Sequence, residues 1–194
     1  MKSWQLKVMG VLLAMLLISG CAPLLLGGAA VGVGVAAHDR RTTGTLVDDQ
    51  SIEVKIHNAL NRQLPPGNRI GVTSYNAAVL LTGITASEAT RQQAEMIARG
   101  ITPVKEVYNE LAVGSSKTSF SAQSNDSLLT TRVKAILFKI RIQDFDPTRV
   151  KVVTEGGVVY LMGLVRKNEA DAAANTASQV SGVKQVVTLF EYIN

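Results

Sequence analysis

The stretch Val79-Leu80-Leu81-Thr82-Gly83 (VLLTG) returns 80 positions later as Val159-Tyr160-Leu161-Met162-Gly163 (VYLMG). Both stretches begin with Val, carry Leu at the third position and end in Gly, and each is apolar enough to form a buried strand. Their surroundings also match, since 49–56 aligns with 126–133 and 104–107 with 183–186. The offset changes by only a few residues, so the sequence predicts two copies of one structural unit.

Each unit contains the same succession of helix, strand, strand, helix and strand. The predicted strands cover residues 70–74, 79–84 and 104–113 in the first unit and residues 150–154, 158–165 and 183–193 in the second. The first unit turns at Tyr75-Asn76, and the second at Glu155-Gly156-Gly157, where paired glycines suit the positive φ of a tight hairpin. The predicted fold class is therefore α+β: two tandem α-β-β-α-β units, each with a three-stranded mixed sheet covered by two helices.

Composition changes mark the limits of the units. We expect the first unit at residues 46–113 and the second at residues 124–194, separated by a small, polar linker at 114–123. Within the units, Thr85 and Glu88 have the spacing of a capping box, and Asn168 is the N-cap candidate of the corresponding second helix. Asp48-Asp49 is interpreted as an N-capping pair for the first helix, not as a catalytic pair of carboxylates.

The start of the chain has the organisation of a lipoprotein signal peptide. A basic stretch, residues 1–7, precedes the apolar residues 8–18, which are too short to cross a bilayer because that takes roughly 20 residues. Ser19 and Gly20 then stand directly before Cys21, the single cysteine of the chain. We therefore predict cleavage after residue 20, lipidation of Cys21 and a Gly/Ala-rich tether at 21–45; an uncleaved signal anchor is the alternative.

The predicted lipid anchor decides the expected location. Ala22 follows Cys21, and in the usual sorting pattern of lipoproteins a residue other than Asp at this position favours the outer membrane. Acyl chains such as palmitate contribute about 0.8 kcal/mol per buried methylene, enough together to hold the periplasm-facing domains stably to a bilayer. The formal charge of +5 falls to near +3 without Lys2 and Lys7, which does not indicate a nucleic-acid partner.

The repeated motifs resemble those of the BON domain. The first unit has Val79-x-Leu81-x-Gly83 and then Ile101-x-x-Val104-x-x-Val107-x-Asn109-x-Leu111. The second unit has Val159-x-Leu161-x-Gly163 and then Val180-x-x-Val183-x-x-Val186, with Thr188 where Asn109 stands in the first. With the lipid site, the chain is similar to outer-membrane lipoproteins that carry two BON domains. The resemblance implies a non-enzymatic envelope protein associated with phospholipid binding, membrane integrity and the division site.

The stretch Asn125–Ile142 (NDSLLTTRVKAILFKIRI) is predicted to form one amphipathic helix with two apolar stripes. One is an ordinary core stripe: Leu129, Val133, Ile136, Leu137 and Ile140. The other faces outward beside four basic residues and includes Leu128, Arg132, Ala135, Phe138, Lys139 and Ile142. The aligned positions of the first unit are polar: Ser51, Lys55, Asn58 and Arg62. The resemblance implies that this helix contacts anionic lipid, with Leu128 at a position that is aromatic in the family.

Two other interpretations of the outward stripe stay open. It could pack against the first unit, or it could bind a protein partner in envelope assembly, division or peptidoglycan remodelling, which would make the chain an adaptor. An enzyme is not predicted, because nucleophilic catalysis needs a nucleophile with a base in reach. Cys21 is committed to lipidation, His38 lies in the tether, and His57 is expected on a solvated helix face. No catalytic, cofactor-binding or metal-binding residues are predicted.

Overall fold

The structure, a computed structural model, describes residues 39–114 and 120–194. The predicted signal peptide, Cys21, His38, most of the tether and half of the linker lie outside the described residues. The residues His38–Asn194 form one compact unit. The three hydrophobic clusters of the described residues all lie within it, so a fragment that begins at residue 38 keeps every one of these core contacts.

Each domain has the predicted order of elements. The first contains α3 (Thr43–Gln63), β1 (Arg69–Tyr75), β2 (Ala78–Thr85), α4 (Glu88–Arg99) and β3 (Glu106–Val113). The second contains α5 (Phe120–Leu137), a short 3-10 helix (Pro147–Arg149), β4 (Val150–Glu155), β5 (Val158–Val165), α6 (Lys167–Ser178) and β6 (Gln185–Tyr192).

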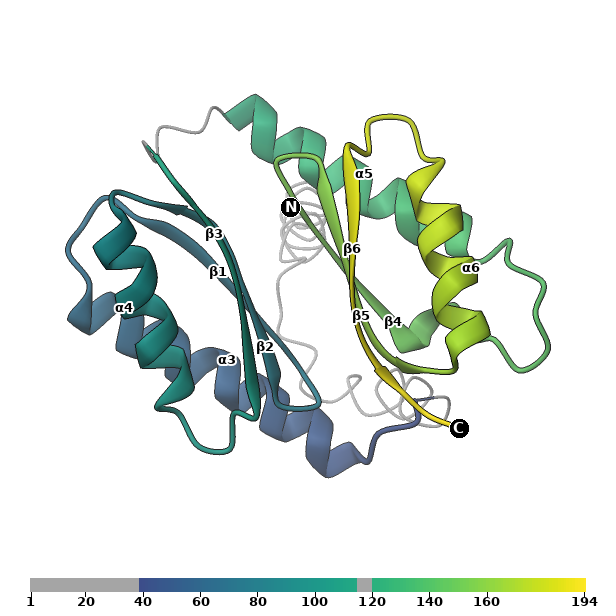
Figure 1. The fold of residues 1–194 in the computed structure, drawn as a ribbon, viewed down its shortest axis with the longest axis horizontal. Coiled ribbons are helices and arrows are strands. Elements are labelled where there is room, and N and C mark those ends of the chain that lie inside the picture. The colour runs from purple at the N-terminus through teal and green to yellow at the C-terminus, as the bar shows by residue number, and fades with distance from the viewer. Residues whose placement is uncertain (1–38, 115–119) are drawn as a thin grey trace, which may run out of the picture. The chain divides into compact units, whose positions relative to one another are not determined.

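The two sheets have the same topology. β1 pairs antiparallel with β2, which pairs parallel with β3, and β4, β5 and β6 repeat this arrangement. The helices α3 and α4 cover one face of the first sheet, and α5 and α6 cover one face of the second (Figure 1). The predicted α+β class with two three-stranded mixed sheets is confirmed.

Alternate residues of the central strands build the core of each domain. Val79 and Leu81 of β2 are fully buried in a cluster that includes Ile52 of α3. Val159 and Leu161 of β5 are fully buried in the equivalent cluster under α5 and α6. The predicted strand period of two therefore places the Val and Leu of the repeated motif on the helix-covered face.

The intervening residues of the central strands point to the opposite face of each sheet. There Leu80 of β2 and Tyr160 and Met162 of β5 form a third hydrophobic cluster with Tyr75. Because this cluster draws on both sheets, the two domains share a core on the faces that the helices leave open. The Tyr75 hydroxyl joins the domains as well, since it donates to the Arg149 carbonyl at 3.2 Å and accepts from the Leu164 N–H at 3.3 Å.

The glycine of the repeated motif is required by the neighbouring strand. Gly83 has φ +117°, and a Cβ there would lie 2.0 Å from the Arg69 carbonyl oxygen of β1. A Cβ added at Gly163 would likewise lie 2.7 Å from the Arg149 carbonyl oxygen. Real Cβ atoms do not approach backbone oxygen so closely, so a side chain at either position would push the hairpin strands apart.

An aspartate ties the first helix of each domain to its hairpin turn, and that of the first domain, Asp49, is buried. Asp49 of α3 accepts hydrogen bonds from the Ser74 hydroxyl at 2.7 Å and from the backbone N–H groups of Asn76 at 2.8 Å and Ala77 at 2.9 Å. Asn76 and Ala77 both have positive φ, so the turn presents its N–H groups on one side. The prediction that Asp49 caps the first helix is wrong, because α3 begins six residues earlier, with Thr42 as its N-cap.

The second domain repeats this arrangement with Asp126 of α5. Its carboxylate accepts from the backbone N–H groups of Gly156 at 2.8 Å and Gly157 at 2.9 Å. Both glycines have positive φ, as the sequence predicts for this turn. The aspartate therefore satisfies N–H groups that a tight turn leaves without backbone partners.

Two further capping predictions are wrong. Helix α4 has Ser87 as its N-cap, while Thr85 is buried and its hydroxyl bonds the carbonyl oxygens of Ser87 and Ala112. Helix α6 begins at Lys167, so its N-cap is Arg166 and not the predicted Asn168. The buried Glu169 side chain accepts from the Arg166 N–H at 2.7 Å, which satisfies the group at that helix end.

The segment before α3 fastens to both domains. Arg40 donates to both carboxylate oxygens of Glu169, at 2.6 and 2.8 Å, and to the Leu164 carbonyl at 3.0 Å. Its neighbour Arg41 donates to Asp49 at 2.7 Å and lies 3.6 Å above the centre of the Tyr75 ring. The Glu169 side chain is only 1% exposed, so its pairing with Arg40 is a buried one.

We expect Asp49→Asn to lower the free energy of unfolding by about 3 kcal/mol, because Arg41 loses a buried partner and an amide cannot accept from all the same donors. Asp48→Asn, at the exposed neighbouring position, should change it by less than about 0.5 kcal/mol. Urea unfolding of the 38–194 fragment measures both values. Equal losses in the two variants would contradict the role of Asp49.

Stability should also fall in acid through Glu169. Burial alone would raise the pKa of Glu169, but the Arg40 guanidinium and the Arg166 N–H outweigh it and hold this pKa below its usual range. The stabilisation is therefore present above the unfolded pKa of about 4.3 and is lost as pH falls through the lower folded value.

Glu169→Gln should accordingly be less stable at neutral pH and lose less stability than the parent between about pH 5 and pH 3. Urea unfolding across this range tests the expectation. Glu88→Gln, with a side chain 53% exposed, is the control. If Glu169→Gln loses as much stability as the parent when the pH falls, groups other than Glu169 cause the acid dependence.

Candidate functional site

The outward side of α5 and the turn after it form the surface predicted to bind lipid. We call the following residues the α5 surface: Leu128, Arg132, Ala135, Phe138, Lys139 and Ile142. Five of the six are exposed, with Leu128 at 56% and Phe138 at 59%, and Ile142 is half-buried. The alternative in which this stripe packs against the first domain is wrong, because five of its six residues are exposed and the core that the domains share lies between the sheets.

The opposite side of α5 holds the helix in place. Leu129, Val133 and Leu137 are buried in the core of the second domain, as predicted, and Ile136 is half-buried. Asp126 fixes the helix to the β4–β5 turn, and the Thr130 hydroxyl donates to the Thr154 hydroxyl at 2.8 Å. These contacts orient the helix so that its other side faces solvent.

The predicted span of this helix, Asn125–Ile142, is wrong at both ends. The helix begins at Phe120 and ends at Leu137. After Leu137 the backbone hydrogen bonds join residues three apart, as in a turn. The Lys139 N–H donates to the Ile136 carbonyl at 2.9 Å, and the Ile140 N–H donates to the Leu137 carbonyl at 3.2 Å. The chain turns here because Ile140 and Phe145 both pack into the core of the domain.

Phe138, Lys139 and Ile142 consequently lie beyond the helix and not on its stripe. Phe138 and Lys139 belong to the turn, where the Arg141 guanidinium donates to the Phe138 carbonyl at 3.1 Å. Leu128, Arg132 and Ala135 remain on one side of the helix, at spacings of four and three residues. The α5 surface therefore consists of a helical part and a turn.

Positive charge on this surface is not neutralised by neighbours. Within residues 39–114 and 120–194, the side chains of Arg132, Lys134 and Lys139 form no hydrogen bond or ion pair. The one acidic residue of α5, Asp126, is held by the β4–β5 turn. Basic side chains beside an exposed leucine and phenylalanine give this surface the chemistry of a site for an amphipathic anion.

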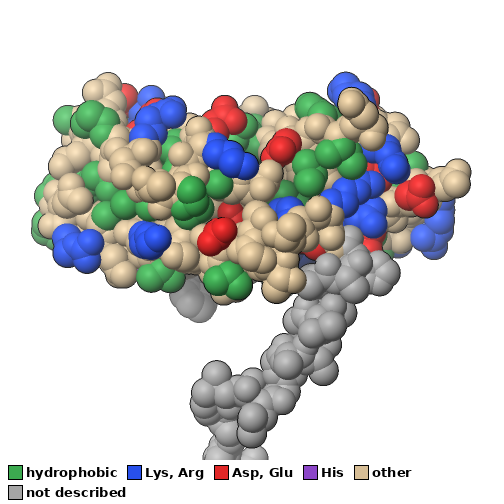
Figure 2. All heavy atoms as spheres, turned by 90° about the horizontal axis from the view of Figure 1, so that it is seen from below, with side chains coloured by type: hydrophobic (Ala, Val, Ile, Leu, Met, Phe, Trp, Pro, Cys, Tyr) green, Lys and Arg blue, Asp and Glu red, His purple; other side chains and the backbone are tan. Residues whose placement is uncertain are grey.

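The first helix of the first domain has a different outward side. Helix α3 carries three acids and two bases, and Lys55, Asn58 and Arg62 are exposed, as predicted. Two exposed apolar residues of α3, Val47 and Val54, were not predicted, and their spacing of seven places them on one side of the helix. Figure 2 shows the side of the molecule on which α3 lies in Figure 1, and there hydrophobic, basic and acidic side chains are interspersed.

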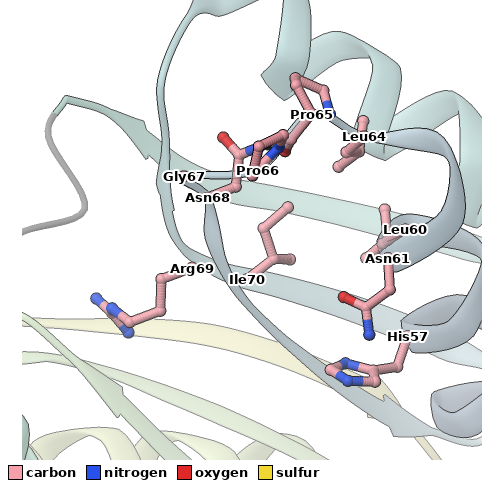
Figure 3. Close-up of a pocket in the computed structure, with 10 residues that line it drawn as sticks. All are labelled: His57, Leu60, Asn61, Leu64, Pro65, Pro66, Gly67, Asn68, Arg69 and Ile70. Atoms are coloured by element: carbon pink, nitrogen blue, oxygen red, sulfur yellow. Dashed lines mark hydrogen bonds between the residues drawn. The ribbon is translucent and has the colours of Figure 1, made fainter.

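A pocket of about 440 Å³ lies between the end of α3 and the loop that leads to β1. Figure 3 shows His57 and Asn61 on the α3 side of this pocket and Pro65 on the loop, while the Arg69 side chain points away from His57. Arg69 is paired with Glu155, at 3.0 Å from one of its oxygens. The pocket lining contains no carboxylate or nucleophile beside the exposed His57, so it lacks the groups of general acid–base catalysis.

The described residues contain neither a metal-binding cluster nor a membrane-spanning helix. No three His, Cys, Asp or Glu side chains among them lie together in a way that could hold a metal ion. None of the helices in residues 39–114 and 120–194 has the length and apolar character that crossing a membrane would require.

Comparison with known proteins places this architecture in a family. The model of the BON domain matches twice, at residues 48–115 and 125–194. The outer membrane lipoprotein DolP of Haemophilus influenzae is 42% identical over 195 residues, which is 97% of each chain.

Two further relatives cover most of the chain. A 21 kDa hemolysin of Actinobacillus pleuropneumoniae is 37% identical over 157 residues, covering 80% of this chain and 79% of the relative. Osmotically-inducible protein Y of Escherichia coli is 30% identical over 201 residues, covering 94% of each. The chain therefore belongs to the BON-domain family and is an outer-membrane lipoprotein of the DolP type.

Proposed function

We propose that this lipoprotein binds anionic phospholipid through the α5 surface and so supports the integrity of the outer membrane. The observation that carries the proposal is the exposed leucine and phenylalanine, Leu128 and Phe138, beside basic side chains that have no partner among the described residues. A bilayer surface offers both complements, since it presents anionic headgroups above an apolar interior.

Charge and burial contribute comparable amounts to such binding. A basic side chain near an anionic leaflet contributes on the order of 1 kcal/mol, and Arg132, Lys134 and Lys139 are all exposed. Inserting Leu128 and Phe138 adds the transfer of apolar area out of water. Each contribution is small, but a chain anchored at Cys21 would meet the membrane at high effective concentration, so weak contacts suffice.

The proposed role is one of binding and not of catalysis. The two BON domains supply a rigid support, because the shared core of the sheets fixes the orientation of α5 relative to the first domain. Residence at the division site enters the proposal through the BON-domain family to which the chain belongs.

A second candidate function is that of an adaptor in envelope assembly or peptidoglycan remodelling. The exposed Val47 and Val54 of α3 favour it, because they give the first domain an apolar contact beside acidic residues that an anionic membrane would repel. On this view the α5 surface holds the membrane while α3 holds a protein.

We expect Leu128→Glu and Lys139→Glu each to weaken binding of the 38–194 fragment to phosphatidylglycerol vesicles by about tenfold. The first change removes apolar contact and adds repulsion, and the second reverses a charge. Vesicle co-sedimentation measures the affinity, and phosphatidylcholine vesicles show whether the binding depends on lipid charge.

The first domain provides the matched controls. Val54→Glu alters an exposed apolar residue of α3, and Arg62→Glu reverses the charge at the position aligned with Lys139. Both should bind vesicles like the parent. If the α5 variants also bind normally, the proposal is wrong. A protein partner that the parent captures without lipid and Val54→Glu does not would favour the adaptor.

A further inference from the structure

A second pocket, of about 350 Å³, opens at one edge of the α5 surface. Its walls come from three places in the second domain: α5, the β4–β5 turn, and the loop between α6 and β6. Leu128 and Arg132 belong to both the pocket and the α5 surface, whereas Ser181, Gly182 and Lys184 come from the loop. The sequence did not single out these loop residues as part of a site, because they lie more than 40 positions beyond the end of α5.

The pocket carries a surplus of positive charge. Arg132 has no partner among the described residues, and Lys184 uses one of its three N–H groups on the Gly156 carbonyl at 2.8 Å. Asp126 is the single acid of the lining, and both of its oxygens already accept from the backbone of the β4–β5 turn. Two cations therefore face one engaged carboxylate, which favours an anionic ligand.

Small residues keep the mouth of the pocket open and polar. Gly182 has φ +98°, and Ser181 beside it is exposed with its hydroxyl available as a donor. Lys184 is held in place because its aliphatic stem lies against Gly157, where an added Cβ would sit 3.2 Å from three of the stem carbons. The ammonium group is thus positioned by packing and by a hydrogen bond.

We propose that this pocket binds the phosphate of an anionic glycerophospholipid headgroup, with Arg132 and Lys184 contacting the phosphate oxygens and Leu128 at the rim among the acyl chains. The inference rests on the proposed membrane binding by α5 and adds a specific headgroup site to it. The occupant follows from charge complementarity together with the apolar rim: a free phosphate would use the two cations but not the leucine.

The first domain contains the same lysine in a different setting. Lys105 aligns with Lys184, and the two backbone N–H groups make equivalent bonds, to Ala77 and Gly157, at 2.9 Å each. However, Thr102-Pro103 stands where the second domain has Ser181-Gly182, and Ser51 stands where it has Leu128. The first domain therefore lacks the apolar rim and the glycine, and Lys105 is a matched control.

The test uses Lys184→Met in the 38–194 fragment, because Met keeps the apolar stem against Gly157 and removes the charge. Binding to phosphatidylglycerol vesicles should weaken about fivefold, while Lys105→Met should bind like the parent and Lys184→Arg should restore most of the affinity. Urea unfolding checks that Lys184→Met is folded, and Arg132→Met provides a second variant that leaves the turn untouched.

A second measurement locates the ligand. Short-chain dihexanoyl-phosphatidylglycerol, added below its micelle concentration, should shift the backbone amide NMR signals of Ser181 and Gly182 in the parent but not in Lys184→Met. Equal shifts with inorganic phosphate at the same concentration would overturn the assignment to lipid.

The two proposals fail in different ways. Normal vesicle binding by Lys184→Met and Arg132→Met, with binding lost in Leu128→Glu, would overturn the headgroup site and leave membrane binding by α5 intact. Normal binding in all three variants would overturn both.

Discussion

Both faces of the central strands β2 and β5 are buried, and this constraint decides which surfaces of the protein stay accessible. One face of each strand lies under its own helices, and the other carries Leu80, Tyr160 and Met162 into the core shared by the sheets. Buried apolar area contributes about 25 cal/mol per Å², so the sheets are favoured to stay together. The outer sides of the helices, the sheet edges and the loops are then what remains for binding.

The two copies share the residues that build the fold and differ in those that face outward. Asp49 and Asp126 hold equivalent hairpin turns, and Gly83 and Gly163 allow equivalent strand approaches. On the outward sides, α3 carries the exposed Asp48 together with the exposed Lys55 and Arg62, whereas the one acid of α5 is engaged by a turn and its bases have no partners among the described residues. A common framework thus presents two chemically different surfaces, and the one on α5 suits an anionic membrane.

Local patterns predicted the elements well and their ends less well. The strand β5 and the glycine turn before it follow from alternation and from the φ that Gly-Gly permits, both of which are properties of neighbouring residues. The end of α5 at Leu137 could not be predicted in this way, because it depends on Ile140 and Phe145 reaching a core built by other segments. The role of Asp49 was missed for a related reason: an aspartate that caps a helix and one that holds a distant turn look alike in sequence.

The sequence by itself determined the duplication, the α-β-β-α-β order, the lipoprotein-like N-terminus and the basic, apolar side of α5, because each depends on residues close together in the chain or on one copy matching the other. Only the tertiary structure decided that the sheets cover each other, that the α5 surface is left exposed, and that Lys184 joins Arg132 at one pocket. Periodicity shows that a side chain is buried but not against what, since packing partners are chosen by contacts far apart in sequence.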